Sequence, residues 1–253
     1  MNARTVIALL ALLCAAEVRA HGGLVDLSVY DRTEGRRLAV HWHEGRAYVV
    51  GKPGNEYQVT MRNRLREDVL TVVSVDGVNV ISGETADPGQ TGYVLGQSRA
   101  YDILGWRKSL AETAAFYFTA LPDSYAARTG RPDNVGVIGV AVFRRKQPPQ
   151  PIAPMLRPGA AEPGAARREA ASDAAAGPRA AQDESRLGTG HGRREVSQVQ
   201  HVAFERATSA PAETITLYYD SQRNLLARGI IREPAPVAPL PRPFPGFAPD
   251  PQG

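Results

Sequence analysis

Apolar and polar residues alternate in short runs between residues 24 and 144, and this pattern predicts a mainly β protein. Residues 25–30 and 57–61 place apolar side chains at every second position, the period of a strand with one buried face. The β-branched runs flanking Asp76 and Gly77 predict a hairpin, because both central residues of a type I′ turn need positive φ. Further strands are expected at residues 38–43, 48–50, 69–75, 78–81, 93–95, 100–104, 116–118 and 135–143.

Two local details complete this region. Residues 93–95 and 100–104 are expected to pair with each other around Gly96, and residues 123–129 are expected to form one helical turn. Many short strands without a long amphipathic helix favour an antiparallel β-sandwich or a barrel-like sheet. We interpret residues 21–145 as one such domain, since about 120 residues suffice for a single core.

A second patterned stretch, residues 187–231, predicts a small C-terminal β-β-α addition. Strands are expected at 196–204 and 214–219, followed by a short helix at 221–227. So short a segment without cysteine makes a poor independent domain. We therefore expect it to dock on the β-sandwich domain and to cover an edge of its sheet.

The remaining segments lack the pattern of a packed core. Residues 146–186 are mostly Pro, Ala, Gly and charged, and residues 232–253 contain eight prolines. Such compositions do not bury enough apolar surface to offset the entropy of ordering the chain. We expect a disordered linker and a disordered Pro-rich tail. The glycine-rich run LGTGHG at 187–192 lacks the ending of a phosphate-binding loop, so it is expected to be a flexible lead-in to the next strand.

Residues 1–20 have the anatomy of a secretory signal peptide. Arg4 precedes an apolar run at 6–16, and Val18 and Ala20 occupy the two positions that a signal peptidase reads. Cleavage after Ala20 leaves His21 as the first residue and predicts a periplasmic or secreted protein. No later apolar run approaches the length needed to cross a bilayer, so no transmembrane segment is expected in the mature chain.

Charge and cysteine content narrow the possible functions. The chain has 30 Lys and Arg against 26 Asp and Glu, a net charge of +4 that is spread along the sequence. This is a weak footprint for nucleic acid, which we do not expect as a partner. The only cysteine, Cys14, lies within the expected signal peptide. The mature chain therefore has no disulfide, thiol nucleophile or thiolate metal site.

Three histidines form the candidate metal site. A terminal amine with its own imidazole chelates copper, and His21 would provide both after cleavage. His41 and His43 lie two residues apart on an expected strand, so both face the same side and one would complete a copper or zinc site. The alternative is that His41 and His43 line a solvated face while Trp42 packs inside, with no cofactor bound.

A second candidate site combines aromatic side chains with arginine. Tyr93, Tyr101, Trp106 and Arg107 are close in sequence, and such residues often contact a sugar or a protein. The alternative is ordinary packing, because alternating aromatic residues also build sheets. No catalytic residue is identified, since the chain lacks Gly-x-Ser-x-Gly and Ser-x-x-Lys motifs.

Five segments of the patterned regions carry a resemblance to other proteins. They are SVDGVNVISGETA (74–86), TGYVLGQSRAYDILGWRKS (91–109), FYFTALPDSYAARTGRPDNVGVIGVAVF (116–143), LGTGHGRREVSQVQHVAFERATS (187–209) and TLYYDSQRNLLARGII (216–231). These segments resemble an uncharacterised group of exported proteobacterial proteins with no established activity. The resemblance covers the patterned parts of the mature chain and implies that they form one unit, but it transfers no catalytic residue.

These observations favour an exported, non-enzymatic β-sandwich module that binds or scaffolds a protein or glycan of the cell envelope. A Pro-rich tail and a long linker fit this class, because they give reach without structure. The alternative is a metal-dependent or hydrolytic enzyme that uses His21, His41 or His43.

Overall fold

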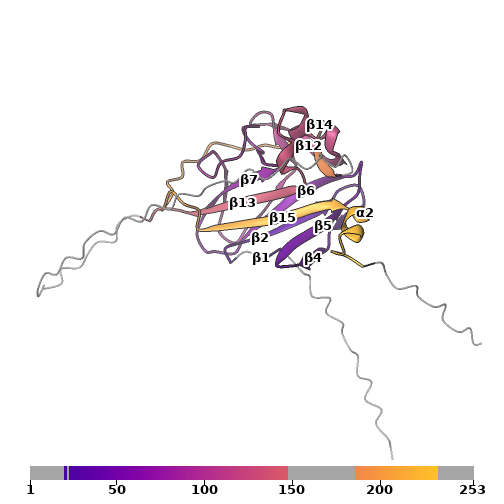
Figure 1. Cartoon of the computed structure of the whole chain (residues 1–253). Coiled ribbons are helices and arrows are strands. Elements are labelled where there is room, and N and C mark those ends of the chain that lie inside the picture. Colours follow the sequence, from indigo (N-terminus) through magenta and orange to yellow (C-terminus); the bar gives the residue numbers. More distant parts are fainter. Residues whose placement is uncertain (1–19, 22, 148–185, 233–253) are drawn as a thin grey trace, which may run out of the picture.

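The computed structural model describes residues 20–21, 23–147 and 186–232. Two sheets pack face to face with only short helical elements at their ends, as Figure 1 shows. The prediction of a mainly β sandwich with a small C-terminal strand and helix addition is confirmed. Among the described residues, no helix is long and apolar enough to cross a membrane.

The first sheet, sheet A, has eight strands, and five of them follow the order β1-β2-β6-β12-β11. Its strands are β1 (Ala20–His21), β2 (Val25–Asp31), β3 (Arg36–Arg37), β6 (Glu56–Asn63), β10 (Ala100–Ile103), β11 (Gly105–Arg107), β12 (Glu112–Ala120) and β14 (Leu187–Val196). β3 pairs with β2, β10 with β6 and β14 with β12. Every pairing in this sheet is antiparallel.

The second sheet, sheet B, has seven strands in the order β4-β5-β15-β13-β7-β8, with β9 also paired to β7. Its strands are β4 (Val40–His43), β5 (Arg46–Gly51), β7 (Val69–Val75), β8 (Val78–Asn79), β9 (Tyr93–Leu95), β13 (Val137–Arg144) and β15 (Glu213–Ser221). The pairing of β15 with β5 is parallel, and the others are antiparallel.

Four short helical elements lie at the ends of strands: η1 (Leu121–Asp123), α1 (Tyr125–Arg128), η2 (Pro132–Asn134) and α2 (Gln222–Ala227). Ser124 caps α1 by accepting from the amide of Ala127, and Ser221 caps α2 by accepting from the amide of Asn224. Such caps satisfy amides that have no partner within the helix. The predicted helical segments at 123–129 and 221–227 are confirmed.

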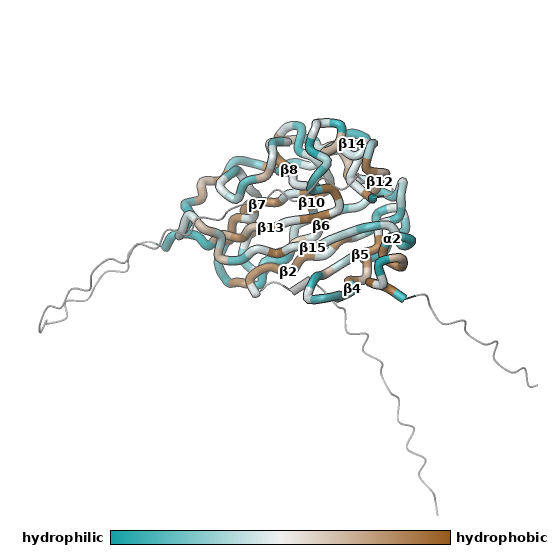
Figure 2. The backbone as a smooth tube through the Cα atoms, in the orientation of Figure 1, coloured by the Kyte–Doolittle hydropathy of each residue, from teal (hydrophilic) through white to brown (hydrophobic). Residues whose placement is uncertain are grey.

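The core lies between the sheets, where the inward side chains of alternating strands meet. In β6, for example, Tyr57, Val59 and Met61 are fully buried. The Tyr57 ring stacks on Phe118 with ring centroids 4.2 Å apart and on Phe116 at 5.3 Å. Hydrophobic stretches follow the strands of the sandwich in Figure 2, while the loops at its ends are hydrophilic. This arrangement is what the period-two pattern predicts.

The predicted Asp-Gly hairpin is present between β7 and β8. Asp76 and Gly77 have φ of +53° and +72°, as a type I′ turn requires. A Cβ on Gly77 would lie 2.8 Å from the Cβ of Asn134, so the turn is also tightly packed against η2. Glycine at position 77 thus meets both the positive φ of the turn and the close approach of Asn134 in η2.

Two expectations about local structure are wrong. The glycine-rich run at 187–192 forms the first half of β14 and is not a flexible lead-in. The strand expected at 196–204 is not formed, because β14 ends at Val196. The small residues have a packing role here: a Cβ on Gly188 would lie 2.6 Å from the Cβ of Ser124 and 2.7 Å from Val135. The run is a strand because it pairs with β12, and its composition is glycine-rich because its neighbours leave no room for side chains.

The expected pairing of residues 93–95 with 100–104 is also wrong. β9 pairs with β7 in sheet B, while β10 pairs with β6 in sheet A. The turn after Gly96 carries the chain from one sheet to the other, and sequence spacing does not distinguish such a crossing from a hairpin.

The C-terminal segment contributes to both sheets. β14 pairs with β12 and covers that edge of sheet A, as expected, whereas β15 lies between β5 and β13 in the interior of sheet B. The signal-peptide prediction for residues 1–20 and nearly all of the expected linker and tail lie outside the described residues, apart from Ala20, residues 146–147, Arg186 and Arg232.

Candidate functional site

A pocket of about 250 Å³ opens at the end of the sandwich where α2, η2 and the start of β14 meet. Its walls are residues 133–137, Arg186 with Leu187, residues 218–220 and Arg228. These residues come from four separate segments of the chain. Only tertiary folding brings them to one place.

Two arginines line this pocket. Arg186 donates from Nη2 to the carbonyl of Val135, and among the described residues no carboxylate lies within ion-pair distance of its guanidinium. Arg228 lies 3.7 Å from Asp220 (Nη1 to Oδ2), and its guanidinium carbon is 5.5 Å from the centre of the Tyr48 ring. The Arg228 side chain is 52% exposed. Both guanidinium groups therefore retain donors for another acceptor.

The carboxylate of Asp220 is already engaged. It accepts 2.7 Å hydrogen bonds from the Ser221 amide and from Nδ2 of Asn224, and a longer one of 3.4 Å from the Leu187 amide. Asp220 thus fixes the start of α2 and of β14, which are two walls of the pocket. The other carboxylate on the lining, Asp133, is on an exposed residue.

A buried polar cluster lies behind the pocket, centred on Asp76, which has no exposed surface. Its carboxylate accepts from the Gly136 amide at 2.9 Å, from the Thr189 amide at 2.8 Å and from the Tyr219 hydroxyl. Gly136 and Tyr219 are themselves on the pocket lining. One side chain therefore holds three separate segments in place behind the pocket.

Three hydroxyls complete this Asp76 cluster. The Oγ1 of Thr189 lies 2.6 Å from both the Tyr57 and the Tyr219 hydroxyl oxygens. A single direction satisfies them all: Tyr57 donates to Thr189, Thr189 to Tyr219, and Tyr219 to Asp76. The cluster thus has no unpaired hydroxyl proton, which makes it suited to a structural role.

Burial decides the ionisation of the Asp76 cluster. Desolvation raises the pKa of Asp76 to about 6, although the hydrogen bonds from Tyr219, Gly136 and Thr189 favour the charged form and oppose the shift. Burial also raises the pKa of Tyr57 and of Tyr219 well above the ordinary value. Both tyrosines therefore stay protonated, and they remain donors across the physiological range.

The predicted metal ligands are divided between the sheets. His41 and His43 share one face of β4 in sheet B, as expected, opposite Tyr48 and Arg46. Trp42 faces the other way but is 53% exposed, so the expectation that it packs inside is wrong; β4 is an edge strand of sheet B. His21 lies in β1 of sheet A, and its side chain is not described.

Within the described part of the chain, no group of three or more His, Cys, Asp or Glu side chains is arranged to hold a metal. The metal hypothesis depends on the His21 side chain and stays a prediction.

The four predicted ligand-binding residues are brought together only in part. Arg107 donates from Nε to the Tyr93 hydroxyl at 3.2 Å and from Nη2 to Ser197 at 3.1 Å. Trp106 is buried and donates to the carbonyl of Gly190 at 3.0 Å. Tyr101 is 38% exposed on β10. The contacts of Arg107 and Trp106 are those of side chains that join parts of the fold. The hypothesis that the four residues bind a ligand stays a prediction.

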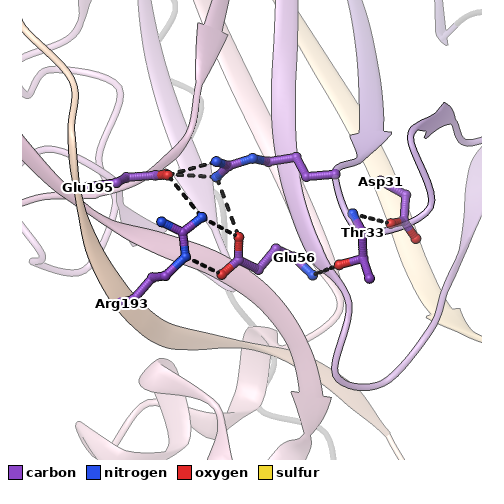
Figure 3. A network of polar contacts seen from close by, with 6 residues as sticks. Asp31, Thr33, Glu56, Arg193 and Glu195 are labelled. Atoms are coloured by element: carbon purple, nitrogen blue, oxygen red, sulfur yellow. Dashed lines mark hydrogen bonds and ion pairs between the residues drawn. The ribbon is translucent and has the colours of Figure 1, made fainter.

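A network of four charges on sheet A fastens β14 to the loop after β2 and to β6 (Figure 3). Arg32 donates to both oxygens of Glu195 at 2.7 Å, and Arg193 donates to both oxygens of Glu56 at 2.9 Å. Contacts of 3.9 Å between Arg32 and Glu56 and of 3.6 Å between Arg193 and Glu195 close the ring. The side-chain hydrogen bonds to the glutamates raise the pKa of both arginines. All four charges are paired with one another, so the network joins β14 to its neighbours and does not offer a free charge to a ligand.

Sequence reasoning missed the residues that define the pocket. Asp76 was identified only as a turn residue, while Arg186 and Arg228 carry no local motif. Comparison with known protein families, with curated proteins and with solved structures found no match, so the geometry alone characterises this site.

Proposed function

We propose that the protein is a non-enzymatic binding or scaffolding module of the bacterial cell envelope and that it contacts its partner through the end pocket. The observation that carries this proposal is a preformed concavity with two arginines, whose walls are held by the Asp76 cluster and by Asp220. A site fixed before the ligand arrives loses little entropy on binding.

The complete burial of Asp76 supports a binding function over a catalytic one. Asp76 has an unusual pKa, which often marks a catalytic group, yet it has no exposed surface and all its contacts are to the protein's own donors. A general base must come within hydrogen-bond distance of the substrate, and Asp76 lies behind Gly136 and Tyr219. The signal-like residues 1–20 support export, and a protein or glycan of the envelope is the proposed partner.

The test is the capture of envelope components by the purified protein and by a pocket-blocking variant. Asp133→Trp places a large side chain on the exposed rim of the pocket without touching the core. Asp123→Trp makes the same change on η1, outside the pocket lining, and is the control. We expect a component that the unchanged protein and Asp123→Trp retain and Asp133→Trp loses. Equal capture by all three would contradict a role for the pocket.

The enzymatic alternative has one supporting observation, the shared face of His41 and His43 on β4. It requires copper or zinc to bind saturably and to raise the melting temperature, with the effect lost in His41→Ala/His43→Ala. His201→Ala, an exposed histidine outside the strands, is the control. The non-enzymatic proposal instead expects the same metal response from the unchanged protein and from both variants.

A further inference from the structure

The end pocket combines size, charge and donor geometry in a way that specifies its ligand. We propose that it binds an anionic group, a carboxylate or phosphate, between the guanidinium groups of Arg186 and Arg228. This inference rests on the proposed binding function and names the chemistry of the ligand.

The first argument is the balance of unused donors and acceptors on the lining. Each guanidinium carries five N–H donors, and the contacts of Arg186 engage only the Val135 carbonyl among the described residues. Arg228 forms an ion pair with Asp220 at 3.7 Å between Nη1 and Oδ2, longer than a hydrogen bond, while Ser221 and Asn224 donate to the other oxygen, Oδ1, of that carboxylate. Two planar, always-charged donor groups thus lie beside a concavity, and among the described residues only Arg228 has a carboxylate, Asp220, within ion-pair distance.

The second argument is that the arginines are held in place. The contact with Val135 anchors Arg186 to the segment that Asp76 fixes through Gly136. The face of Tyr48 lies against Arg228, and Tyr48 belongs to the apolar cluster of Leu225 and Ile230 under α2. Holding both side chains before binding lowers the entropic cost of ordering them around an anion.

The third argument concerns size and the opposing charges. A pocket of about 250 Å³ accommodates a small anion or the end group of a larger molecule, rather than a whole drug-sized ligand. The titratable groups on the lining are Asp133, Asp220, Arg186, Arg228 and two tyrosines. Asp220 offsets part of the charge of Arg228, which its Oδ2 faces at 3.7 Å, and Asp133 carries the other negative charge on the lining. Removing that charge should therefore strengthen anion binding.

The experiment is a titration of the purified protein with inorganic phosphate, glucuronate and glucose at constant ionic strength, followed by calorimetry. Phosphate and glucuronate supply the two forms of the anion, and glucose is the uncharged counterpart of glucuronate. We expect saturable binding of at least one anion and none of glucose. Arg186→Gln and Arg228→Gln should each weaken binding by about tenfold. Asp133→Asn should strengthen it by about threefold.

Arg223→Gln is the matched control, because Arg223 is exposed on α2 and outside the pocket lining. Its affinity should equal that of the unchanged protein. Arg186→Lys keeps the charge and is expected to weaken binding less than Arg186→Gln, which separates a lost ligand contact from lost folding. Melting temperatures of all variants accompany the titrations.

Absence of saturable binding by both anions would overturn the inference, as would equal affinity of the Gln variants and the unchanged protein. The proposed function fails differently. If Asp133→Trp still captures the same envelope component, the pocket is not the contact surface. If that capture is lost but neither anion binds, the proposal of a binding module holds and only the proposal of an anionic ligand is wrong.

Discussion

At the scale of single residues, the carboxylate of Asp76 has consequences beyond its turn. It connects the hairpin of β7 and β8 to Gly136, Thr189 and Tyr219, all distant in sequence. Because desolvation raises its pKa to about 6, Asp76 binds a proton more tightly in the folded than in the unfolded chain. This difference links the stability of the fold to pH.

The Asp76 shift predicts a fall in stability as pH rises from about 4 to about 6. Below that window both states hold the proton, and above it neither does. Within it the folded state holds the proton while the unfolded state loses it, so the contribution of Asp76 decreases by at most about 1.4 kcal/mol per pH unit. Urea unfolding midpoints across this window provide the measurement.

Asp76→Asn should remove this slope, and Asp123→Asn should keep it. Asn tolerates positive φ, so the turn itself is preserved. One of the three hydrogen bonds loses its acceptor, and we expect a loss of about 1–3 kcal/mol near neutral pH. The lysine and arginine beside Glu34 lower its pKa to about 2, which acts with the opposite sign and at lower pH. An unchanged slope in Asp76→Asn would contradict the assignment.

At the scale of elements, strands are joined by close backbone approach and by charge. Gly105 in β11 shows the first: a Cβ there would lie 1.9 Å from the carbonyl oxygen of Ala114 in β12. Gly105→Ala forces the two strands apart, so we expect a loss of at least about 1–3 kcal/mol in the free energy of unfolding. Gly96→Ala, which meets only ordinary contacts at 3.5 Å or more, is the control. Similar unfolding midpoints for both variants would contradict this.

The charge network of Figure 3 is the basis of a second prediction for the elements, which concerns the stability contributed by Glu195. The Glu195 side chain is only 9% exposed and bonds both arginine partners, whereas Glu205 is 69% exposed beside Lys146. Glu195→Gln should cost about 1–3 kcal/mol, because two guanidinium groups lose a shared partner. Glu205→Gln should cost at most about 0.5 kcal/mol. The urea unfolding midpoints of the two variants provide the measurement. Equal losses in the free energy of unfolding would show that Glu195 is an ordinary surface charge.

At the scale of the whole molecule, the two ends of the described chain depend on each other. β15 lies between β5 and β13, so its removal would separate sheet B into two parts. Its first residue, Glu213, accepts from the amides of Gly23, Leu24 and Val25, just after the expected cleavage site. Residues before and after segment 148–185 therefore share one core.

We predict that residues 24–144 and 187–231 fold only together. Without β15, the inward side chains of β5 and β13 lose their neighbour and the backbone nitrogens of Leu24 and Val25 lose their acceptor. Each piece alone should show no cooperative unfolding, while the mixture should recover it, measured by circular dichroism during urea titration. Cooperative unfolding of either piece alone would contradict the prediction.

The sequence by itself determined the class of fold and most of its strands, because alternation and turn chemistry are local. The runs around Asp76-Gly77 and at 57–61 are strands for that reason. It also identified the shared face of His41 and His43, which follows from strand geometry alone.

Only the tertiary structure decided which strands pair and where the pocket lies. β14 is a strand because its backbone pairs with β12, and β9 and β10 separate because the chain crosses between sheets. Asp76, Arg186 and Arg228 gain their roles from partners more than forty positions away in sequence, such as Gly136, Val135 and Tyr48. Such contacts depend on the packing of the whole core, and no local pattern of residue types encodes them.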